Sequence, residues 1–288
     1  MLDLSHIPNS QQNIQIFNAN GSAWQTWQKP RKCNYVWIMC IGGAGGGAAG
    51  ATVDNSSAGG GASGAITRVL YNAQQLSDIL YVQVGLGGVG GLNSGALGSN
   101  GTRSLVALQP TVLAQNLVII SGSTAAIGGS GVSTGETAST QVTATFFTLG
   151  NFISTPGRAN NTVGVLDVTP LTSQITCAGA AGGRFNSTPA IFQPGSILST
   201  PYSSLIPNGI STSATGVNGT DGGDGVTIWK PFFSVGGAGG GASTTANGGK
   251  GGNGGIGSGG GGGGAGATLA QGGSGGKGGD GIVIIISF

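Results

Sequence analysis

Short apolar runs are spread along the chain and separated by turn-forming or glycine-rich segments. The strongest are Tyr35–Ile41 and Ile282–Phe288, which are rich in β-branched and aromatic residues and each adjoin a glycine run. Such runs are typical of buried strands. Because an exposed apolar terminal strand is an aggregation hazard, we expect 282–288 to be covered or paired. Further strands are predicted at 14–17, 65–71, 79–84, 103–108, 117–121 and 141–148.

The predicted strands are short and evenly spaced, and sustained helical periodicity is absent. Residues 72–78 read as one helical turn or a tight loop. We therefore predict an all-β fold, in which β-sandwich or jelly-roll-like strands are combined with packed polyglycine-II helices and there is no substantial α-helix.

Glycine organises the rest of the chain. It supplies 63 of the 288 residues, about three times its usual share. Two runs, 42–48 and 236–242, have the same sequence Gly-Gly-Ala-Gly-Gly-Gly-Ala, and 248–256 and 272–280 repeat Gly-Gly-X. A period of three is that of a polyproline-II-type helix, which has no internal hydrogen bonds. Its N–H and C=O groups must bond to neighbouring strands, so we expect the runs to pack side by side.

Composition divides the chain into four segments. Residues 1–30 are predicted to be an N-terminal arm and attachment segment, and 31–149 a glycine-rich β domain. The stretch 150–220 is a Pro/Ser/Thr-rich loop region, either ordered loops that carry recognition, which we favour, or a partly disordered excursion. Residues 221–288 are predicted to form polyglycine-II strands and a closing β-strand, packed with 31–149.

Titratable groups are too scarce for a catalytic system. His6 is the only histidine and Glu136 the only glutamate, so we expect no enzyme and no cofactor. No metal site is expected, because the three cysteines lack metal-ligand spacing. The aspartates in glycine loops read as turn or cap residues rather than as cation ligands: Asp221, Asp224 and Asp280.

Charge and hydropathy exclude two classes of partner. Charged residues are 6% of the chain and the net charge is +2, so a nucleic-acid partner is not expected. The one basic cluster, Lys29 to Lys32, reads as a solvated turn. No segment approaches the length of an apolar membrane span, and the N-terminus lacks the features of a signal peptide, so neither membrane insertion nor classical secretion is expected.

The strand-to-glycine transitions at 36–47 and 64–91 and the closing Gly-Gly-Asp-Gly-Ile-Val-Ile-Ile resemble the glycine-rich domain of many tailed-phage tail-fibre and other virion proteins. The Gly-Gly-X runs are similar to those of T-even-type tip adhesins. This resemblance implies a glycine scaffold at 248–264 and 272–281, with receptor recognition in the loops between glycine motifs. The loops concerned would be 92–102, 132–140 and 184–216, with Phe185, Phe192 and Tyr202 as receptor-contact candidates.

The function we expect is that of a non-enzymatic virion protein, a tail-fibre or head-fibre component assembled in the host cytoplasm. Its partners would be further copies of itself, with a trimer implied by the resemblance, other virion proteins and a bacterial surface receptor. The alternative is the repeating subunit of a filament, which donates 1–12 or 282–288 to the next copy. Trp24 and Trp27 could grip a partner or pack in the core, and the assembly candidates are Trp24, Trp27, Ile282, Ile284 and Phe288.

Overall fold

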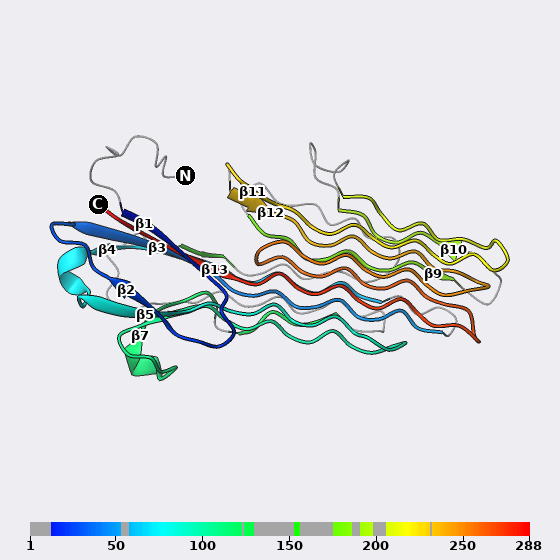
Figure 1. The fold of residues 1–288 in the computed structure, drawn as a ribbon, viewed down its shortest axis with the longest axis horizontal. Coiled ribbons are helices and arrows are strands. Elements are labelled where there is room, and N and C mark those ends of the chain that lie inside the picture. Colours follow the sequence, from blue (N-terminus) through cyan, green and yellow to red (C-terminus); the bar gives the residue numbers. More distant parts are fainter. Residues whose placement is uncertain are drawn as a thin grey trace.

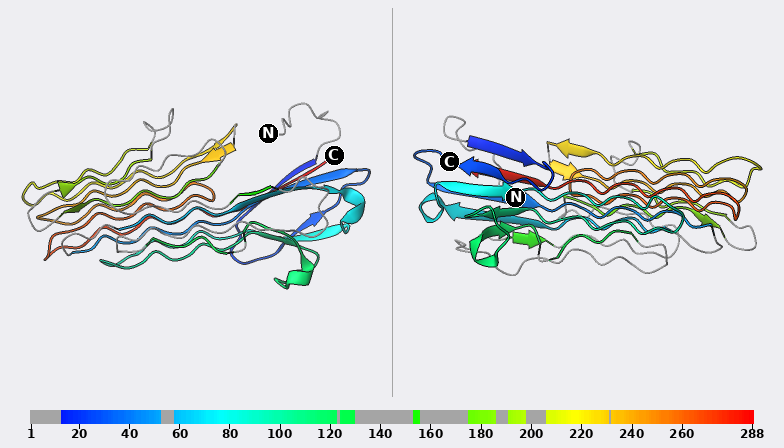
Figure 2. Two further views of the ribbon diagram at one scale, coloured as in Figure 1. Left: turned by 180° about the vertical axis from the view of Figure 1, so that it is seen from behind. Right: turned by 60° about the horizontal axis from the view of Figure 1, so that its bottom comes forward.

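The computed structural model is an elongated molecule, with β-sheets at one end and a bundle of extended, glycine-rich strands at the other (Figure 1). The structure describes residues 13–52, 58–122, 124–129, 153–155, 175–185, 191–197, 206–230 and 232–288. The predicted strand at 141–148 lies outside these residues. Two further views show that the glycine-rich strands run side by side along the long axis (Figure 2).

Nearly all of the regular structure is β, as predicted. The two 3₁₀ turns among the described residues are three residues long, η2 (Ala73–Gln75) and η3 (Ala114–Asn116). The strands are β1 (Asn13–Asn18), β2 (Gln25–Gln28), β3 (Tyr35–Ile41), β4 (Ile66–Asn72), β5 (Ile79–Gln83), β6 (Leu105–Ala107), β7 (Leu117–Ile120), β8 (Ile153–Thr155), β9 (Arg184–Phe185), β10 (Ile191–Phe192), β11 (Thr227–Trp229), β12 (Phe232–Ser234) and β13 (Ile282–Ser287).

Two antiparallel sheets form a sandwich at one end of the molecule. The five-stranded sheet has the order β1-β13-β3-β4-β8, and the four-stranded sheet has the order β2-β5-β6-β7. Alternate side chains of the two sheets meet in one buried cluster, in which Ile38 and Ile285 of the first sheet and Leu80 of the second are fully enclosed. The hydroxyl of Tyr71 donates to the carbonyl oxygen of Val118 at 2.8 Å and so ties the two sheets together.

The C-terminal strand β13 is central in its sheet. It pairs with β1 on one side and with β3 on the other, each time over six residues. The expectation that this apolar terminal strand is paired is therefore confirmed.

The run that follows β3, Gly42–Gly50, is the centre of a bundle of extended strands. Its successive N–H groups donate to three different neighbours in rotation: Gly45 to Ala62, Gly46 to Ser99 and Gly47 to Gly276, at 2.8–3.0 Å. Its carbonyl groups accept from three other neighbours, because Gly88, Gly129 and Gly260 donate to it. Six strands thus surround the run, as the period of three requires.

The same arrangement is repeated around the second copy of the glycine sequence. Gly240 donates to Gly262 and Gly241 to Thr220, and Gly183 and Gly249 donate back to this run. The all-glycine segment 259–264 lies between the two centres and is bonded to both, since Gly260 donates to Gly45 and Gly237 donates to Gly259. We call the whole assembly the glycine lattice. Both repeated runs are enclosed, which explains why their sequences match.

Close approach, rather than an unusual backbone angle, makes glycine necessary in the lattice. A Cβ added at Gly261 would lie less than 3.0 Å from the carbonyl oxygen of Ala238, and most lattice glycines have a backbone neighbour as close. Among the described glycines, a positive φ occurs only at Gly21, Gly95, Gly216 and Gly257.

Three aspartates on the lattice surface accept hydrogen bonds from the backbone of a neighbouring strand. The carboxylate of Asp221 accepts from the N–H of Lys250, and that of Asp224 accepts from the N–H of Asn253, both at 2.7 Å. Asp280 accepts in the same way from Gly87 at 2.8 Å. The aspartates predicted as turn or cap residues thus accept from backbone N–H groups of neighbouring strands rather than from a local turn. Five of the six X residues in 248–256 and 272–280 are polar, whereas the sixth, Ile256, is half-buried against the apolar cluster that contains Ile282.

Two predicted segment boundaries differ from the structure. From Asn13 onwards the segment 1–30 belongs to the sandwich, because its apolar side chains Phe17 and Trp27 are buried in the core on β1 and β2. The loop region 150–220 contributes lattice strands, since Gly179 donates to Gly61 and Gly209 to Gly239. Segments 31–149 and 221–288 pack together, because β3 pairs with β13 and the glycine runs of the two segments are hydrogen-bonded to each other in the lattice.

Candidate receptor-contact surface

Four chain reversals gather at the end of the lattice that is farthest from the sandwich: 93–95, 214–216, 244–246 and 267–270. We call them the distal turns. Their bends lie at one end of the long axis in Figure 1, whereas β1 and the C-terminus lie at the other. Because each turn joins two lattice strands, the lattice fixes its position.

Hydrogen bonds connect the distal turns into one surface. The N–H of Gly216 donates to the hydroxyl of Thr245 at 3.1 Å, and that hydroxyl donates to the carbonyl oxygen of Ala214 at 2.7 Å. Ala267 donates to the carbonyl oxygen of Ala246 at 3.0 Å. The hydroxyl of Ser94, in the first turn, accepts at 2.9 Å from the N–H of Gly272, which follows the fourth turn.

The chemistry of this surface is neutral. The distal turns contain Ser, Thr, Asn, Ala, Gly and Leu and no ionisable side chain. Leu269 is fully exposed, and Leu92, beside the first turn, is 73% exposed. A surface of this kind can bind through hydrogen bonds from hydroxyl, amide and backbone groups and through small apolar contacts.

Phe185 and Phe192, the predicted receptor-contact residues that the structure describes, lie outside the distal turns. Phe185 is buried against Ala242 and Ala265, because β9 folds against the lattice. Phe192 is half-buried and lies under the guanidinium of Arg184, 4.5 Å from the ring centroid. Tyr202 and the loop 132–140 lie outside the described residues.

The other predicted recognition loops are only partly loops. In the segment 92–102 only residues 93–95 bend, and the remainder forms a lattice strand in which Gly98 donates to Gly129. In the segment 184–216 the described residues include the β9–β10 hairpin, a lattice strand and the distal turn 214–216.

Sequence reasoning missed the turns at 244–246 and 267–270. A signal was present, because the glycine pattern is interrupted there by Ser-Thr-Thr-Ala-Asn and by Ala-Thr-Leu-Ala-Gln.

Two of the predicted assembly residues are inaccessible. Trp27 and Ile282 are 0% exposed, the first in the sandwich core and the second under Met39, Ile41 and Ile66. Trp24 is half-buried. Ile284 is half-buried on the outer face of the five-stranded sheet, and the half-buried Phe288 packs against Tyr35 with 5.9 Å between the ring centroids.

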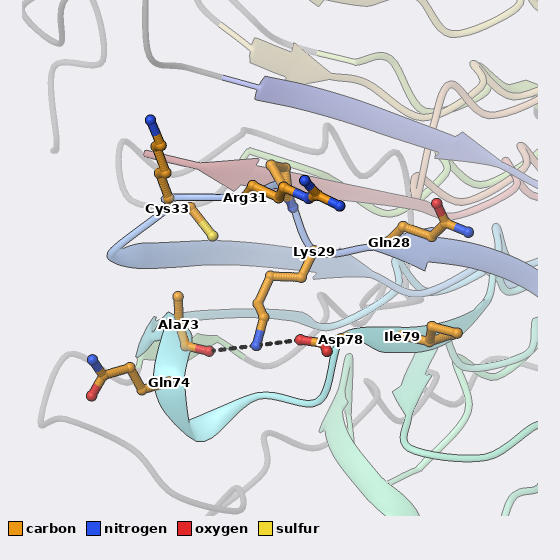
Figure 3. A pocket seen from close by; sticks show the side chains of 10 residues that line it. Gln28, Lys29, Arg31, Cys33, Ala73, Gln74, Asp78 and Ile79 are labelled. Atoms are coloured by element: carbon orange, nitrogen blue, oxygen red, sulfur yellow. Dashed lines mark hydrogen bonds and ion pairs between the residues drawn. The ribbon is translucent and has the colours of Figure 1, made fainter.

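A cavity of about 510 Å³ lies beside the basic cluster at the sandwich end (Figure 3). The ammonium group of Lys29 donates to the carbonyl oxygens of Ala73 and Leu76, at 3.2 and 2.8 Å, and pairs with Asp78 at 2.9 Å. Figure 3 shows the side chain of Arg31 pointing away from this ammonium group. The Lys29 side chain thus connects the turn that follows β2 to η2 and the residues just after it.

A metal-binding cluster is not found in the described part of the chain. This part contains no cluster of three or more His, Cys, Asp or Glu side chains that could hold a metal ion. Burial raises the pKa of the Cys40 thiol far above its usual range, which keeps this thiol protonated. Nor does any described helix have the length and apolar character needed to cross a bilayer.

Comparison with known protein families gives one finding. A family model described as a glycine-rich domain matches residues 18–287, nearly the whole chain. No protein of curated function matches the sequence.

Proposed function

The chain belongs to the glycine-rich domain family, and on that premise we propose that it is a non-enzymatic structural protein of a tailed-phage virion. In this role it is a tail-fibre or head-fibre component that presents the distal turns to a receptor on the bacterial surface. The phage assignment rests on the sequence resemblance between this chain and phage glycine-rich virion proteins.

The observation that carries the proposal is the position of the distal turns on the lattice. Asn13 and Phe288 lie at the sandwich end, so attachment there leaves the opposite end free for contact (Figure 1). A rigid scaffold lowers the entropy lost when its loops bind, because the loops are already ordered. Several copies on one virion would add avidity to weak individual contacts.

A cell-binding assay tests this role. We expect the fluorescently labelled chain to bind cells of some strains in a bacterial panel, and the double variant Leu92→Asn/Leu269→Asn to bind at least tenfold less. The control is Val112→Asn, which changes an exposed aliphatic residue (64% exposed) outside the distal turns. Binding to no strain, or equal binding by the double variant and the wild type, would overturn the proposal.

The filament alternative is less well supported by the contacts of β13. Donation of 282–288 to another copy would break its pairing with both β1 and β3. The other predicted donor, 1–12, lies outside the described residues. Negative-stain electron microscopy over a concentration series separates the two functions, because discrete particles fit a fibre component and long unbranched filaments fit the alternative.

A further inference from the structure

Strand β1 forms an open edge of the five-stranded sheet. It pairs with β13 from Asn13, opposite Ser287, to Asn18, opposite Ile282. No strand in the described part of the chain pairs with its other side. Alternate N–H and C=O groups of an antiparallel strand point away from its partner, so β1 presents a row of backbone groups to solvent.

The features that normally protect a sheet edge are missing from β1. Its sequence, Asn-Ile-Gln-Ile-Phe-Asn, contains no lysine, no other charge and no proline. Its register with β13 continues over all six residues without a bulge. Natural edges usually carry such features, because an unprotected flat edge pairs with another chain.

An apolar surface extends to this edge on the outer face of the sheet. Ile14 and Ile16 are 54% and 48% exposed. Ile14 continues a row with Ile286 and Trp37. Ile16 continues the next row through Ile284 and Met39 to Arg68, the only charged residue in the two rows, whose pKa is lowered by burial. An added strand would therefore extend an existing apolar face.

We propose that β1 pairs with β1 of a second copy of this chain, antiparallel and about a two-fold axis at Gln15. The strand is self-complementary in this register. Ile14 would stand beside Ile16 of the second copy on the apolar face, and Gln15 would stand beside Gln15 of that copy on the opposite face. Cross-strand pairs of this kind stabilise a sheet, and the shared edge closes the assembly as a dimer.

The direction of the strands sets the shape of the dimer. Strand β13 leaves the lattice, so β1, which is antiparallel to it, runs toward the lattice. In the dimer the two lattices therefore point in opposite directions, and both sets of distal turns stay uncovered. The pairing requires no virion and does not depend on the proposed receptor contact.

Sedimentation velocity on the full chain tests the pairing directly. We expect a reversible monomer–dimer equilibrium in a concentration series, and a dissociation constant at least tenfold larger for Ile16→Lys. The matched control is Val89→Lys, which introduces the same charge at an aliphatic residue of similar exposure (57%) on the lattice. A wild-type chain that stays monomeric, or a dimer that Ile16→Lys leaves intact, would refute the proposal.

A cross-linking experiment tests the register independently of stability. In the proposed pairing the two Cβ atoms at position 15 are about 5 Å apart, so Gln15→Cys should form an intermolecular disulfide under mild oxidation. The half-exposed thiol of Cys33 is first removed as Cys33→Ser, and Val89→Cys in the same background is the control. Equal dimer yields from positions 15 and 89 would contradict the register, and circular dichroism confirms that each variant is folded.

Discussion

Gly275 packs directly against Gly47, so that a Cβ built on Gly275 would lie less than 3.0 Å from the carbonyl oxygen of Gly47. Gly275 also donates its N–H to the carbonyl oxygen of Gly91 at 2.9 Å. It is held between two neighbouring strands, neither of which can move without breaking further hydrogen bonds. The lattice therefore depends on the absence of a side chain at this position.

The first prediction concerns this contact. Gly275→Ala should lower the free energy of unfolding by about 3 kcal/mol, the upper part of the range for overpacking, because a backbone carbonyl cannot rotate away as a side chain can. Urea unfolding monitored by circular dichroism measures the change. The neighbouring Ser274→Ala, on the half-exposed X position, should change the stability by less than about 0.5 kcal/mol. Equal effects at 274 and 275 would show that close packing is not the cause.

The second prediction concerns the surface caps of the lattice. Asp224→Ala removes the acceptor for the N–H of Asn253 and should cost about 1 kcal/mol, the usual contribution of such a hydrogen bond. Asp224→Asn keeps an acceptor oxygen in the same place and should restore most of this loss. Thermal unfolding of the two variants measures the difference. If Asn is no better than Ala, the hydrogen bond does not stabilise the lattice.

The third prediction concerns the bond between the two sheets. Tyr71→Phe removes the hydroxyl that donates to Val118 in the buried core, so we expect a loss of about 1–2 kcal/mol. Chemical unfolding followed by tryptophan fluorescence provides the measurement. Tyr81→Phe, at a half-exposed position on β5, is the control and should have little effect. A neutral Tyr71→Phe would indicate that the sheets are held by apolar packing alone.

The fourth prediction concerns the dependence of stability on pH. Burial raises the pKa of the Cys40 thiol in the folded protein, whereas in the unfolded chain this thiol titrates near its ordinary value of about 8.5. The stability that the protonated thiol gives to the folded protein is fully present below that pH. It is lost as the pH rises above it, because the thiol of the unfolded chain then ionises. The loss amounts to about 2 kcal/mol at pH ~10.

The variant Cys40→Ala isolates this effect from other groups that titrate at high pH. The variant should be less stable at neutral pH because it leaves a cavity. Its further loss between neutral pH and pH ~10 should be smaller than that of the wild type by about 2 kcal/mol. Unfolding curves measured at several pH values give the comparison, and two parallel pH profiles would contradict the assignment.

Much of the local structure could be predicted from sequence because it depends on local composition. The apolar run Tyr35–Ile41 is a strand with those bounds, and the apolar run at the C-terminus is β13. The Gly-Gly-X period predicted extended strands that bond to neighbours, and the two matching glycine runs are the centres of the bundle. A period of three leaves only neighbouring strands as partners for the backbone groups.

The candidate site was less accessible to prediction. The aromatic residues of the Pro-rich stretch seemed suited to recognition, but Phe185 is buried by Ala242 and Ala265, which are far from it in sequence. The distal turns lie together because their lattice strands are adjacent, a relationship that spans from Ser94 to Gly272.

Glycine triplets are alike, so the sequence by itself determined that the chain would form strands and a lattice, but not which triplet meets which. The tertiary structure decided that Gly47 bonds to Gly276, that β13 is central and that β1 is left at the edge. The physical reason is that a glycine strand has no side chains to specify its register. The register comes from the adjoining sandwich, where Ile41 must stand opposite Ile282 to keep both buried.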